Sequence, residues 1–260
     1  MKRYSIVLFV LLAAGFRLAA QDLSLYQKEY YVVGSDTLPY RILLPVNYDP
    51  NTKYPLIYFL HGSGERGRDN EKQLVHGGKL FLTDDNRRDY PAIVVFPQCP
   101  QNSSWTNVSS KRGTDGTRQF NFMSDTPVTK GMEMAQGLLK QLLSSYPVKK
   151  KQVYVAGLSM GGMGTYEIVR RNPTLFAAAI PICGGGNTDI KKKMKKVDWW
   201  IFHGAKDASV PPVLSEQMHE ALLNAGAKAK LTIYPEATHN SWDLAFAEKE
   251  LLPWLFSQRK

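Results

Sequence analysis

The sequence is poor in cysteine and has no long hydrophobic run. Of its 260 residues only Cys99 and Cys183 are cysteine. Two cysteines are too few for a disulfide framework, and these two do not have the spacing of a zinc site. The longest unbroken apolar run, Ile6–Ala14, is well short of the roughly 20 residues that span a membrane. With 43% hydrophobic and 22% charged residues and no internal repeat, the composition excludes a disordered or fibrous chain and predicts a globular one.

The first twenty residues have the pattern of a secretory signal. Lys2 and Arg3 form a positive end, the apolar run Ile6–Ala14 follows, and Ala19 and Ala20 offer small residues before Gln21. We therefore predict a signal peptide over 1–20 and a mature chain over 21–260, in the periplasm or outside the cell. Three of the ten net positive charges lie in the signal segment, so the mature chain carries +7.

Short apolar runs alternate with stretches of helical spacing along most of the chain. The runs are nearly continuous, which indicates strands covered on both faces, as in a parallel sheet between two layers of helices. Segments 30–33 and 40–44 have no helix between them and are expected to pair as an antiparallel edge. The pattern predicts one α/β domain with a mostly parallel, doubly wound sheet. The expected strands are 56–60, 92–96, 153–156, 177–182, 199–202 and 231–234, and the expected helices are 132–143, 161–171, 214–223 and 244–256.

Residues 98–129 interrupt this pattern. They are polar and rich in glycine, without helical or strand periodicity, and a structureless segment of that length in a compact domain is usually functional or mobile. Trp105 lies within it, and we treat this indole as a candidate substrate contact. The shape of the segment is expected to set substrate specificity.

The strongest catalytic signal is the pentapeptide Gly157–Gly161, which reads Gly-Leu-Ser-Met-Gly. It follows the expected strand 153–156 and opens the expected helix 161–171, which is where a nucleophile elbow is found. The glycines provide room for a tight turn that forces Ser159 into a strained backbone conformation. The pattern predicts Ser159 as a nucleophile.

A serine hydroxyl needs a base to accept its proton. His239 follows the last expected strand in a loop before the final helix, and it comes last in the chain order Ser, Asp, His. The other four histidines fit the role less well. His61 and His203 each end a strand before a glycine and are expected to shape turns, whereas His76 and His219 are expected to be structural or surface residues.

The acid that orients the base is expected on a loop that reaches the imidazole. Asp207 follows the expected strand 199–202 and fits this place. Asp189 and Asp198 are alternatives by chain order alone. Asp198 precedes its strand and so belongs at the opposite edge of the sheet, and Asp189 lies beside a lysine run and is expected to be solvated.

Hydrolysis through a tetrahedral intermediate also requires N–H donors for its oxyanion. The backbone N–H of Met160, directly after the nucleophile, is one expected donor. The second is expected from the glycine-rich segment His61–Gly67, where Ser63 is favoured and its neighbour Gly64 is also possible by position.

Four motifs together resemble the α/β-hydrolase superfamily. They are Leu60–Gly67, Gly157–Gly162, the His203-Gly204-x-x-Asp207-x-x-Val210-Pro211 stretch and His239–Trp242. Over roughly residues 25–258 the chain is similar to secreted bacterial carboxylesterases called "predicted peptidase", themselves similar to feruloyl and acetylxylan esterases and polyhydroxyalkanoate depolymerases. The resemblance implies an α/β-hydrolase fold, a Ser159–Asp207–His239 triad and an oxyanion hole at Ser63 and Met160. It also makes Trp242 a candidate pocket residue. Dienelactone hydrolases of the superfamily carry a cysteine nucleophile, and Ser159 departs from that pattern.

The remaining signals predict no further chemistry. In the usual strand order Cys99 and Cys183 would end strands about 14 Å apart, beyond the reach of a disulfide, so both are expected to be free and buried. The lysine run 191–196 lacks interleaved aromatics and is expected to be solvated surface. Affinity for an acidic polysaccharide is a distant second interpretation, and no nucleic-acid partner is expected. No metal site and no cofactor is expected.

The sequence as a whole predicts an exported, cofactor-free serine carboxylesterase. Its expected substrate is a carboxylic ester on a small molecule or on a plant polysaccharide, for example an acyl or feruloyl ester. Two alternatives stay open at this point, a serine peptidase of the same fold and a non-catalytic sugar-binding protein. A lipase is disfavoured because residues 98–129 are too polar for a lipase lid.

Overall fold

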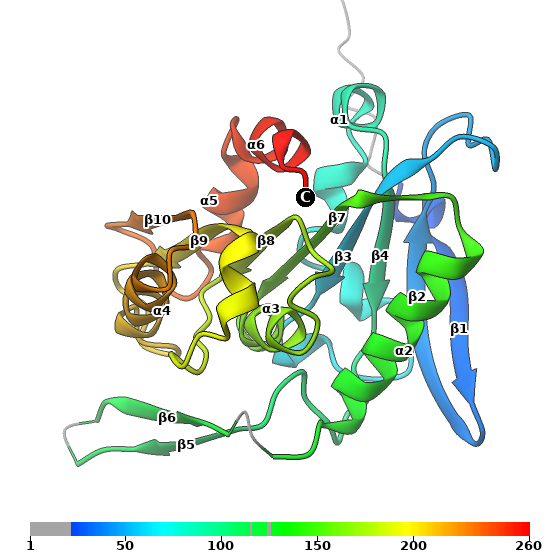
Figure 1. Cartoon of the computed structure of the whole chain (residues 1–260). Helices are drawn as coiled ribbons and strands as arrows, with labels where there is room; N and C mark the ends of the chain where they lie inside the picture. Colours follow the sequence, from blue (N-terminus) through cyan, green and yellow to red (C-terminus); the bar gives the residue numbers. More distant parts are fainter. Residues whose placement is uncertain (1–21, 115, 124–125) are drawn as a thin grey trace, which may run out of the picture.

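The computed structural model describes residues 22–114, 116–123 and 126–260 (Figure 1). The signal peptide expected over 1–20 lies outside the described residues. An eight-stranded sheet runs through the centre of the molecule in the order β1-β2-β4-β3-β7-β8-β9-β10. The strands are β1 Gln27–Val33, β2 Asp36–Leu43, β3 Tyr54–Leu60, β4 Ile93–Pro97, β7 Val148–Leu158, β8 Ala178–Ile182, β9 Asp198–Gly204 and β10 Ala229–Tyr234.

The sheet is parallel except at its N-terminal edge. β1 pairs with β2 and β2 pairs with β4 in antiparallel fashion, whereas every neighbouring pair from β4 to β10 is parallel. The prediction of a mostly parallel sheet with an antiparallel edge is confirmed. Because the carboxyl ends of parallel strands share one edge, the residues after β3, β7, β8 and β9 meet there.

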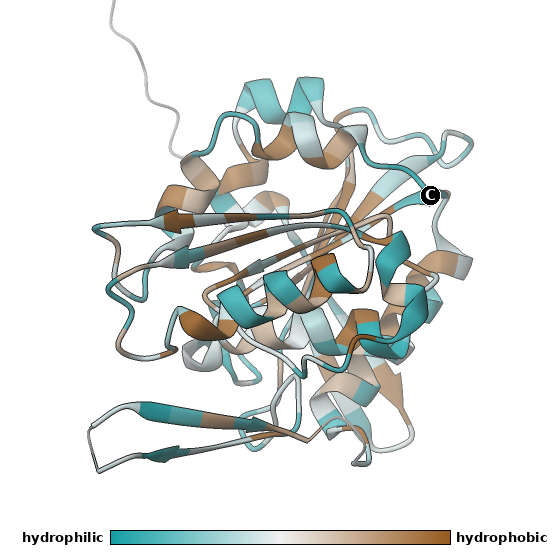
Figure 2. Ribbon diagram, turned by 60° about the vertical axis from the view of Figure 1, so that its left-hand side comes forward, coloured by the Kyte–Doolittle hydropathy of each residue, from teal (hydrophilic) through white to brown (hydrophobic). Residues whose placement is uncertain are grey.

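Helices cover both faces of the sheet, and alternate strand residues pack against each layer. α2, α3 and α4 lie over one face, whereas α5, α6 and short 3-10 turns lie over the other. Apolar strands lie between helices whose outer surfaces are polar (Figure 2). No helix in the described part of the chain is long and apolar enough to cross a membrane. The helices are α1 Asp84–Asp89, α2 Lys130–Ser145, α3 Met160–Arg171, α4 Val213–Asn224, α5 Trp242–Ala247 and α6 Leu251–Ser257.

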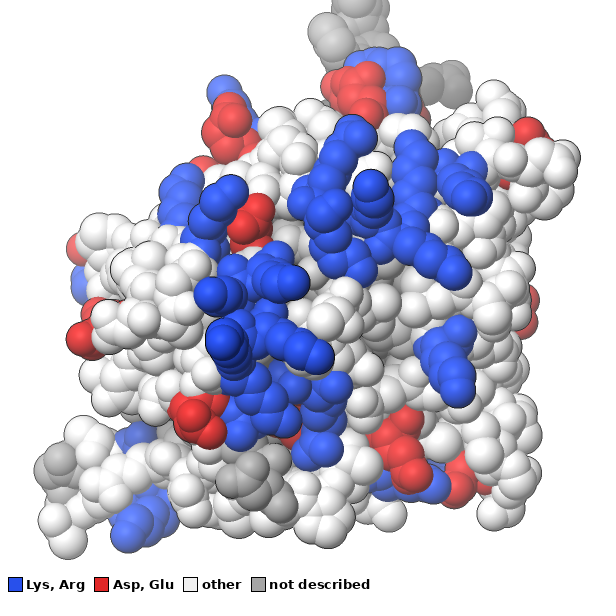
Figure 3. Space-filling view, viewed as in Figure 1, with Lys and Arg blue, Asp and Glu red and all other residues white. Residues whose placement is uncertain are grey.

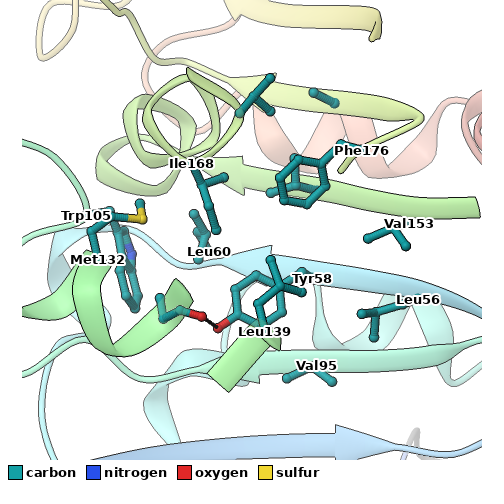
Figure 4. Packing of buried hydrophobic residues seen from close by; sticks show 14 of the residues in the cluster. Leu56, Tyr58, Leu60, Val95, Trp105, Met132, Leu139, Val153, Ile168 and Phe176 are labelled. Atoms are coloured by element: carbon teal, nitrogen blue, oxygen red, sulfur yellow. Dashed lines mark hydrogen bonds between the residues drawn. The ribbon is translucent and has the colours of Figure 1, made fainter. Parts of the chain in front are cut away.

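The core beneath α2 and α3 fixes these helices to the central strands. Leu60 and Ile168 pack close to Trp105 and Met132 in this layer (Figure 4). The hydroxyl of Tyr58 is buried with them and donates a 2.9 Å hydrogen bond to the carbonyl of Ala135 in α2. Because Tyr58 and Trp105 are buried with their polar atoms hydrogen-bonded, this part of the layer is a firm support for the loops at the carboxyl edge.

The single helix expected over 244–256 is wrong, because two helices occupy this stretch. α5 ends at Ala247 and α6 begins at Leu251. Pro253 lacks an N–H and its ring would clash with the carbonyl of residue 249 in a continuous helix. Pro253 is tolerated in the first turn of α6, so the chain breaks before it.

Residues 98–129 are not structureless, contrary to expectation. They contain a two-stranded antiparallel hairpin of β5 Val108–Arg112 and β6 Arg118–Phe122, which extends away from the main sheet (Figure 1). Phe120 and Phe122 alternate with polar residues on β6, and their rings stack 6.2 Å apart. That alternation is a strand signal, but it is too short to stand out among the polar residues around it.

The two cysteines are free and buried, as predicted. Cys99 follows β4 and Cys183 follows β8, and β3 and β7 lie between those strands. The strand order therefore keeps the two thiols apart.

Candidate active site

Ser159 lies in a strained turn between β7 and α3. Its backbone has φ 53° and ψ −116°, a conformation that L-residues rarely adopt. A Cβ on Gly161 would lie 1.8 Å from the carbonyl oxygen of Leu60, and one on Gly157 would lie 2.3 Å from the oxygen of Gly161. The turn can form only because both flanking positions lack a side chain, and it lifts the Ser159 hydroxyl above the sheet edge.

Three side chains far apart in the sequence form one hydrogen-bonded chain. His239 Nε2 lies 2.9 Å from Ser159 Oγ, and His239 Nδ1 lies 2.7 Å from Asp207 Oδ2. Nδ1 faces a carboxylate and donates to it, which leaves Nε2 as the acceptor for the serine proton. The Ser159 and His239 side chains are partly exposed at this edge, whereas the Asp207 side chain is fully buried.

Asp207 is held as a carboxylate by several donors. Its Oδ1 accepts hydrogen bonds from the backbone N–H groups of Ser209 and Val210, at 2.8 and 2.9 Å. Its Oδ2 accepts from His203 and His239. Burial alone would raise the pKa of Asp207, but the hydrogen bonds from His203, His239 and Val210 outweigh it and hold the pKa well below its ordinary value. The group therefore stays negatively charged beside the imidazole.

His203 is closer to the site than the sequence indicated. It was expected only to shape a turn, yet its Nε2 lies 3.1 Å from Asp207 Oδ2 and 2.9 Å from the carbonyl oxygen of Val210. Both neighbours are acceptors, so Nε2 carries a proton and donates. Its other nitrogen, Nδ1, lies 2.6 Å from Ser215 Oγ in α4. The spacing of His203 and Asp207 was visible in the sequence, but nothing there showed that the two side chains face each other.

The alternatives to Asp207 and His239 lie elsewhere. Asp198 begins β9, at the opposite edge of the sheet, and Asp189 is exposed and pairs with Arg170. His61 is buried, with Nδ1 2.6 Å from the carbonyl of Gly62 and Nε2 accepting from the N–H of Cys99. Burial lowers the pKa of His61 to about 4, so it is neutral at physiological pH. His61 therefore holds the turns after β3 and β4 together.

The candidate oxyanion donors lie next to the elbow. Met160 is the first residue of α3, so its N–H has no acceptor within the helix. Ser63 and Gly64 form a short 3-10 turn directly after Gly62. A Cβ on Gly62 would lie 2.9 Å from the side chain of Leu158, so this turn packs against the end of β7 beside Ser159.

Trp242 contributes an aromatic wall beside His239, with the two rings in an edge-to-face arrangement 5.5 Å apart. The ring of His76 also packs on Trp242, with the ring centroids 4.9 Å apart, and His76 Nε2 lies 3.9 Å from Glu65 Oε1. His76 was expected to be structural, and its contact with Trp242 places it near the site. No periodic pattern in the sequence marks this contact, because it depends on how 3-10 turns fold over the sheet.

Trp105 is wrong as a candidate substrate contact. Its side chain is 0% exposed, its indole N–H donates to the carbonyl of His61, and Gly164 of α3 lies against it. Aromatics in polar segments often mark ligand sites, but this one anchors residues 98–129 to the core.

Among the described residues, Cys183, Asp207 and His239 have potential metal-ligand atoms within 4.8 Å of one another. The set does not fit a resident metal. Burial raises the pKa of the Cys183 thiol well above its ordinary value, so it is not the thiolate that metals bind. Both Asp207 oxygens already accept hydrogen bonds from protein donors.

Comparisons with solved structures support the fold. A thermostable esterase superposes with a TM-score of 0.81 at 32% identity, covering 92% of this chain and 64% of that one. A serine-to-alanine mutant of a feruloyl esterase module from Clostridium thermocellum, in complex with sinapinate, gives a TM-score of 0.65 at 19% identity over 89% of this chain and 88% of that one.

Sequence comparisons find similar esterases in longer proteins. A bifunctional acetylxylan esterase/xylanase from Neocallimastix patriciarum is 26% identical over 70% of this chain and 22% of its own length. An endo-1,4-beta-xylanase/feruloyl esterase from Xylanibacter ruminicola is 29% identical over 76% of this chain and 26% of its own. The chain thus spans about a quarter of these relatives. The family model described as "Putative esterase" matches residues 35–200, more than half of the chain. The protein belongs to this esterase family and has the α/β-hydrolase fold that its motifs predicted.

Proposed function

We propose that the protein is a serine carboxylesterase that works through an acyl-enzyme on Ser159. The observation that carries this proposal is the continuous line of hydrogen bonds from Ser159 Oγ through both nitrogens of His239 to Asp207 Oδ2. A binding protein gains nothing from a strained serine aligned with a base and a buried carboxylate. Backbone strain of this kind persists where it serves a purpose.

In the proposed first step His239 Nε2 takes the proton of Ser159 as Oγ attacks the ester carbonyl carbon. The carbonyl π electrons move to oxygen, and the N–H groups of Met160 and Ser63, with Gly64 as the alternative to Ser63, stabilise the oxyanion. Collapse expels the alcohol, which receives the proton from His239. Water then attacks the acyl-enzyme by the same route and releases the acid and Ser159. Asp207 stabilises the imidazolium throughout and remains ionised.

The substrate class proposed is an acetyl or feruloyl ester carried by a plant polysaccharide. The names of the two relatives supply this proposal, since one is an acetylxylan esterase and the other a feruloyl esterase. Trp242 is the proposed pocket wall, because a partly exposed indole against the base is placed to contact an acyl group. The signal-like pattern of residues 1–20 supports export, where such polymers are found.

The proposal is tested with matched substrates on the wild type and on Ser159→Ala. An acetyl ester, a feruloyl ester and a peptide amide are compared by kcat/KM, with the circular dichroism spectrum of both proteins as a check of folding. We expect ester hydrolysis by the wild type and loss of at least about a thousandfold in the variant. Amides turning over faster than esters would make the protein a peptidase. Activity that survives in Ser159→Ala would refute the mechanism.

A further inference from the structure

A basic face covers the edge of the sheet where β7, β9 and β10 begin. Lys and Arg side chains crowd this side of the molecule, with few acidic ones among them (Figure 3). They come from segments far apart in the sequence that the fold brings together, namely the start of β7, the 3-10 turn before β9, the loop before β10 and the C-terminus. We define the basic face as Lys53, Lys149, Lys150, Lys151, Lys191, Lys192, Lys193, Lys195, Lys196, Lys228, Arg259 and Lys260, all exposed.

The basic face is hollowed rather than flat. One hollow of about 690 Å³ is lined by Lys151, Lys195, Lys196, Lys228, Arg259 and Lys260. A second, of about 520 Å³, is lined by Lys53, Lys149, Lys150, Lys151 and Arg259. The two share Lys151 and Arg259 and therefore adjoin. Among the described residues, Asp198 is the one acidic side chain that lines either hollow.

In the part of the chain that the structure describes, these cations form no ion pairs with the protein's own acidic side chains, although the ammonium group of Lys260 donates a hydrogen bond to the carbonyl of Thr174. Elsewhere Lys28, Lys72 and Lys130 pair with carboxylates, but within the described residues no ion pair of 4.0 Å or less engages a side chain of the basic face. Unneutralised like charges repel one another and weaken the compact state. An anionic ligand with several charges would remove that cost by supplying the missing partners.

The chemistry of the two hollows favours one class of polyanion. The cations are lysines with a single arginine, so they attract carboxylates and phosphates alike, mostly as point charges. No exposed aromatic side chain lines either hollow to stack a nucleic-acid base, since Tyr146 is half-buried and Phe176 is buried. The surface is concave and presents no exposed large apolar side chain for insertion into a bilayer. Carboxylates repeated along a polar sugar chain fit these conditions.

We propose that the basic face binds the uronic-acid units of an acidic polysaccharide and so holds the enzyme on its polymeric substrate. This role rests on the proposed function. Lys151 lies near the start of β7 and Ser159 directly follows its end, eight residues on, which in extended chain is roughly 25 Å. The basic face is therefore separate from the catalytic edge, and many weak contacts along one polymer add up to useful affinity.

The test uses the full-length Ser159→Ala protein, which cannot turn over an ester by the proposed route, with polygalacturonate as the probe. Binding is measured by retardation in polygalacturonate gels. Neutral arabinoxylan, duplex DNA and phosphatidylserine vesicles are measured at the same salt concentration. The triple variant Lys151→Gln, Lys196→Gln, Lys228→Gln is compared with Lys111→Gln, Lys140→Gln, Lys249→Gln, which removes the same charge from exposed positions outside the basic face.

We expect polygalacturonate binding that falls steeply between about 0.05 M and about 0.3 M salt. It should weaken at least tenfold in the basic-face variant and less than twofold in the control. Equal losses in the two variants, no binding, or tighter binding of DNA or vesicles than of polygalacturonate would overturn the proposal. Hydrolysis of a small acetyl ester by the two triple variants in the Ser159 background should be unchanged. The hydrolysis assay therefore reports on the proposed function and the gel assay on the basic face, so the two can fail separately.

Discussion

His203 and His239 place ring nitrogens 3.1 and 2.7 Å from the same oxygen of Asp207, Oδ2. The two imidazoles come from the end of β9 and from the loop after β10, so this one oxygen joins two neighbouring segments. His203 is fully buried, and Ser215 and Val210 fix its ring through contacts to Nδ1 and Nε2. His203 thus acts as a positioning residue that holds the carboxylate on which His239 is oriented.

Replacing His203 is expected to slow ester hydrolysis without abolishing it. A hydrogen bond to a charged group contributes about 1.5–3 kcal/mol, so His203→Leu, which removes the donor, should lower kcat/KM by about ten- to a hundredfold. With one donor gone, Oδ2 carries more negative charge and holds the imidazolium form of His239 more firmly. The acid limb of the pH–rate profile should therefore move to higher pH.

His219→Leu is the matched control, because the His219 ring hydrogen-bonds the carbonyl of Ala229 at the start of β10, at the opposite edge of the sheet from the site. Ser215→Ala should give a smaller effect in the same direction as His203→Leu, since it frees only Nδ1 of His203. An unchanged pH profile in a folded His203→Leu protein would show that His203 serves the fold alone.

Asp207→Asn is expected to keep the fold and lose most activity. The amide is nearly isosteric, but it cannot stabilise the imidazolium and it favours the wrong tautomer of His239, which costs about 10⁴ in kcat in a triad of this kind. Steady-state kinetics on an acetyl ester measures the loss. A fall of less than tenfold would mean that another group orients His239.

The tight turn at Ser159 should tolerate no side chain at position 161. Gly161→Ala would put a Cβ 1.8 Å from the Leu60 carbonyl oxygen, backbone that cannot move aside cheaply. We expect a fall in unfolding free energy of more than about 3 kcal/mol or failure to fold. Gly64→Ala is the control, since nothing lies within 4 Å of the added atom, and it should be close to neutral in denaturant unfolding. Equal stability of the two variants would contradict the geometry of the elbow.

His61 should make the fold sensitive to mild acid. Its pKa is about 4 in the folded protein and about 6.5 in a free chain. The unfolded state therefore binds more protons across this window, and stability falls as pH drops from about 6.5 to about 4, by up to about 3 kcal/mol in total. His61→Gln keeps an acceptor for the Cys99 N–H but does not titrate. Its free energy of unfolding should fall less over the same window, and parallel curves for the two proteins would refute the assignment.

The sequence predicted the main strands, helices and fold class well, because the patterns that indicate them are local. Continuous apolar runs such as 153–156 mark buried parallel strands, and the glycines around Ser159 mark the elbow directly. The order of Ser159, Asp207 and His239 was sufficient to predict their convergence, since each follows a strand and the strands share one edge.

What the sequence could not predict depends on contacts between distant segments. The hydrogen bond of His203 to Asp207 depends on which way a buried ring turns, and the burial of Trp105 depends on how residues 98–129 fold back onto α3. The packing of His76 on Trp242 joins two segments 166 positions apart. None of these three contacts produces a periodic pattern in the sequence.

The central claim is a covalent acyl group on Ser159, and trapping that intermediate tests it most directly. The protein is mixed with an activated acyl ester, quenched in acid within milliseconds and digested for mass spectrometry, with His239→Ala as the inactive control. We predict an acyl group on the peptide that contains Ser159 in the wild type and none in the control. Steady turnover with the acyl group on another residue, or with none on Ser159 at any quench time, would contradict the account.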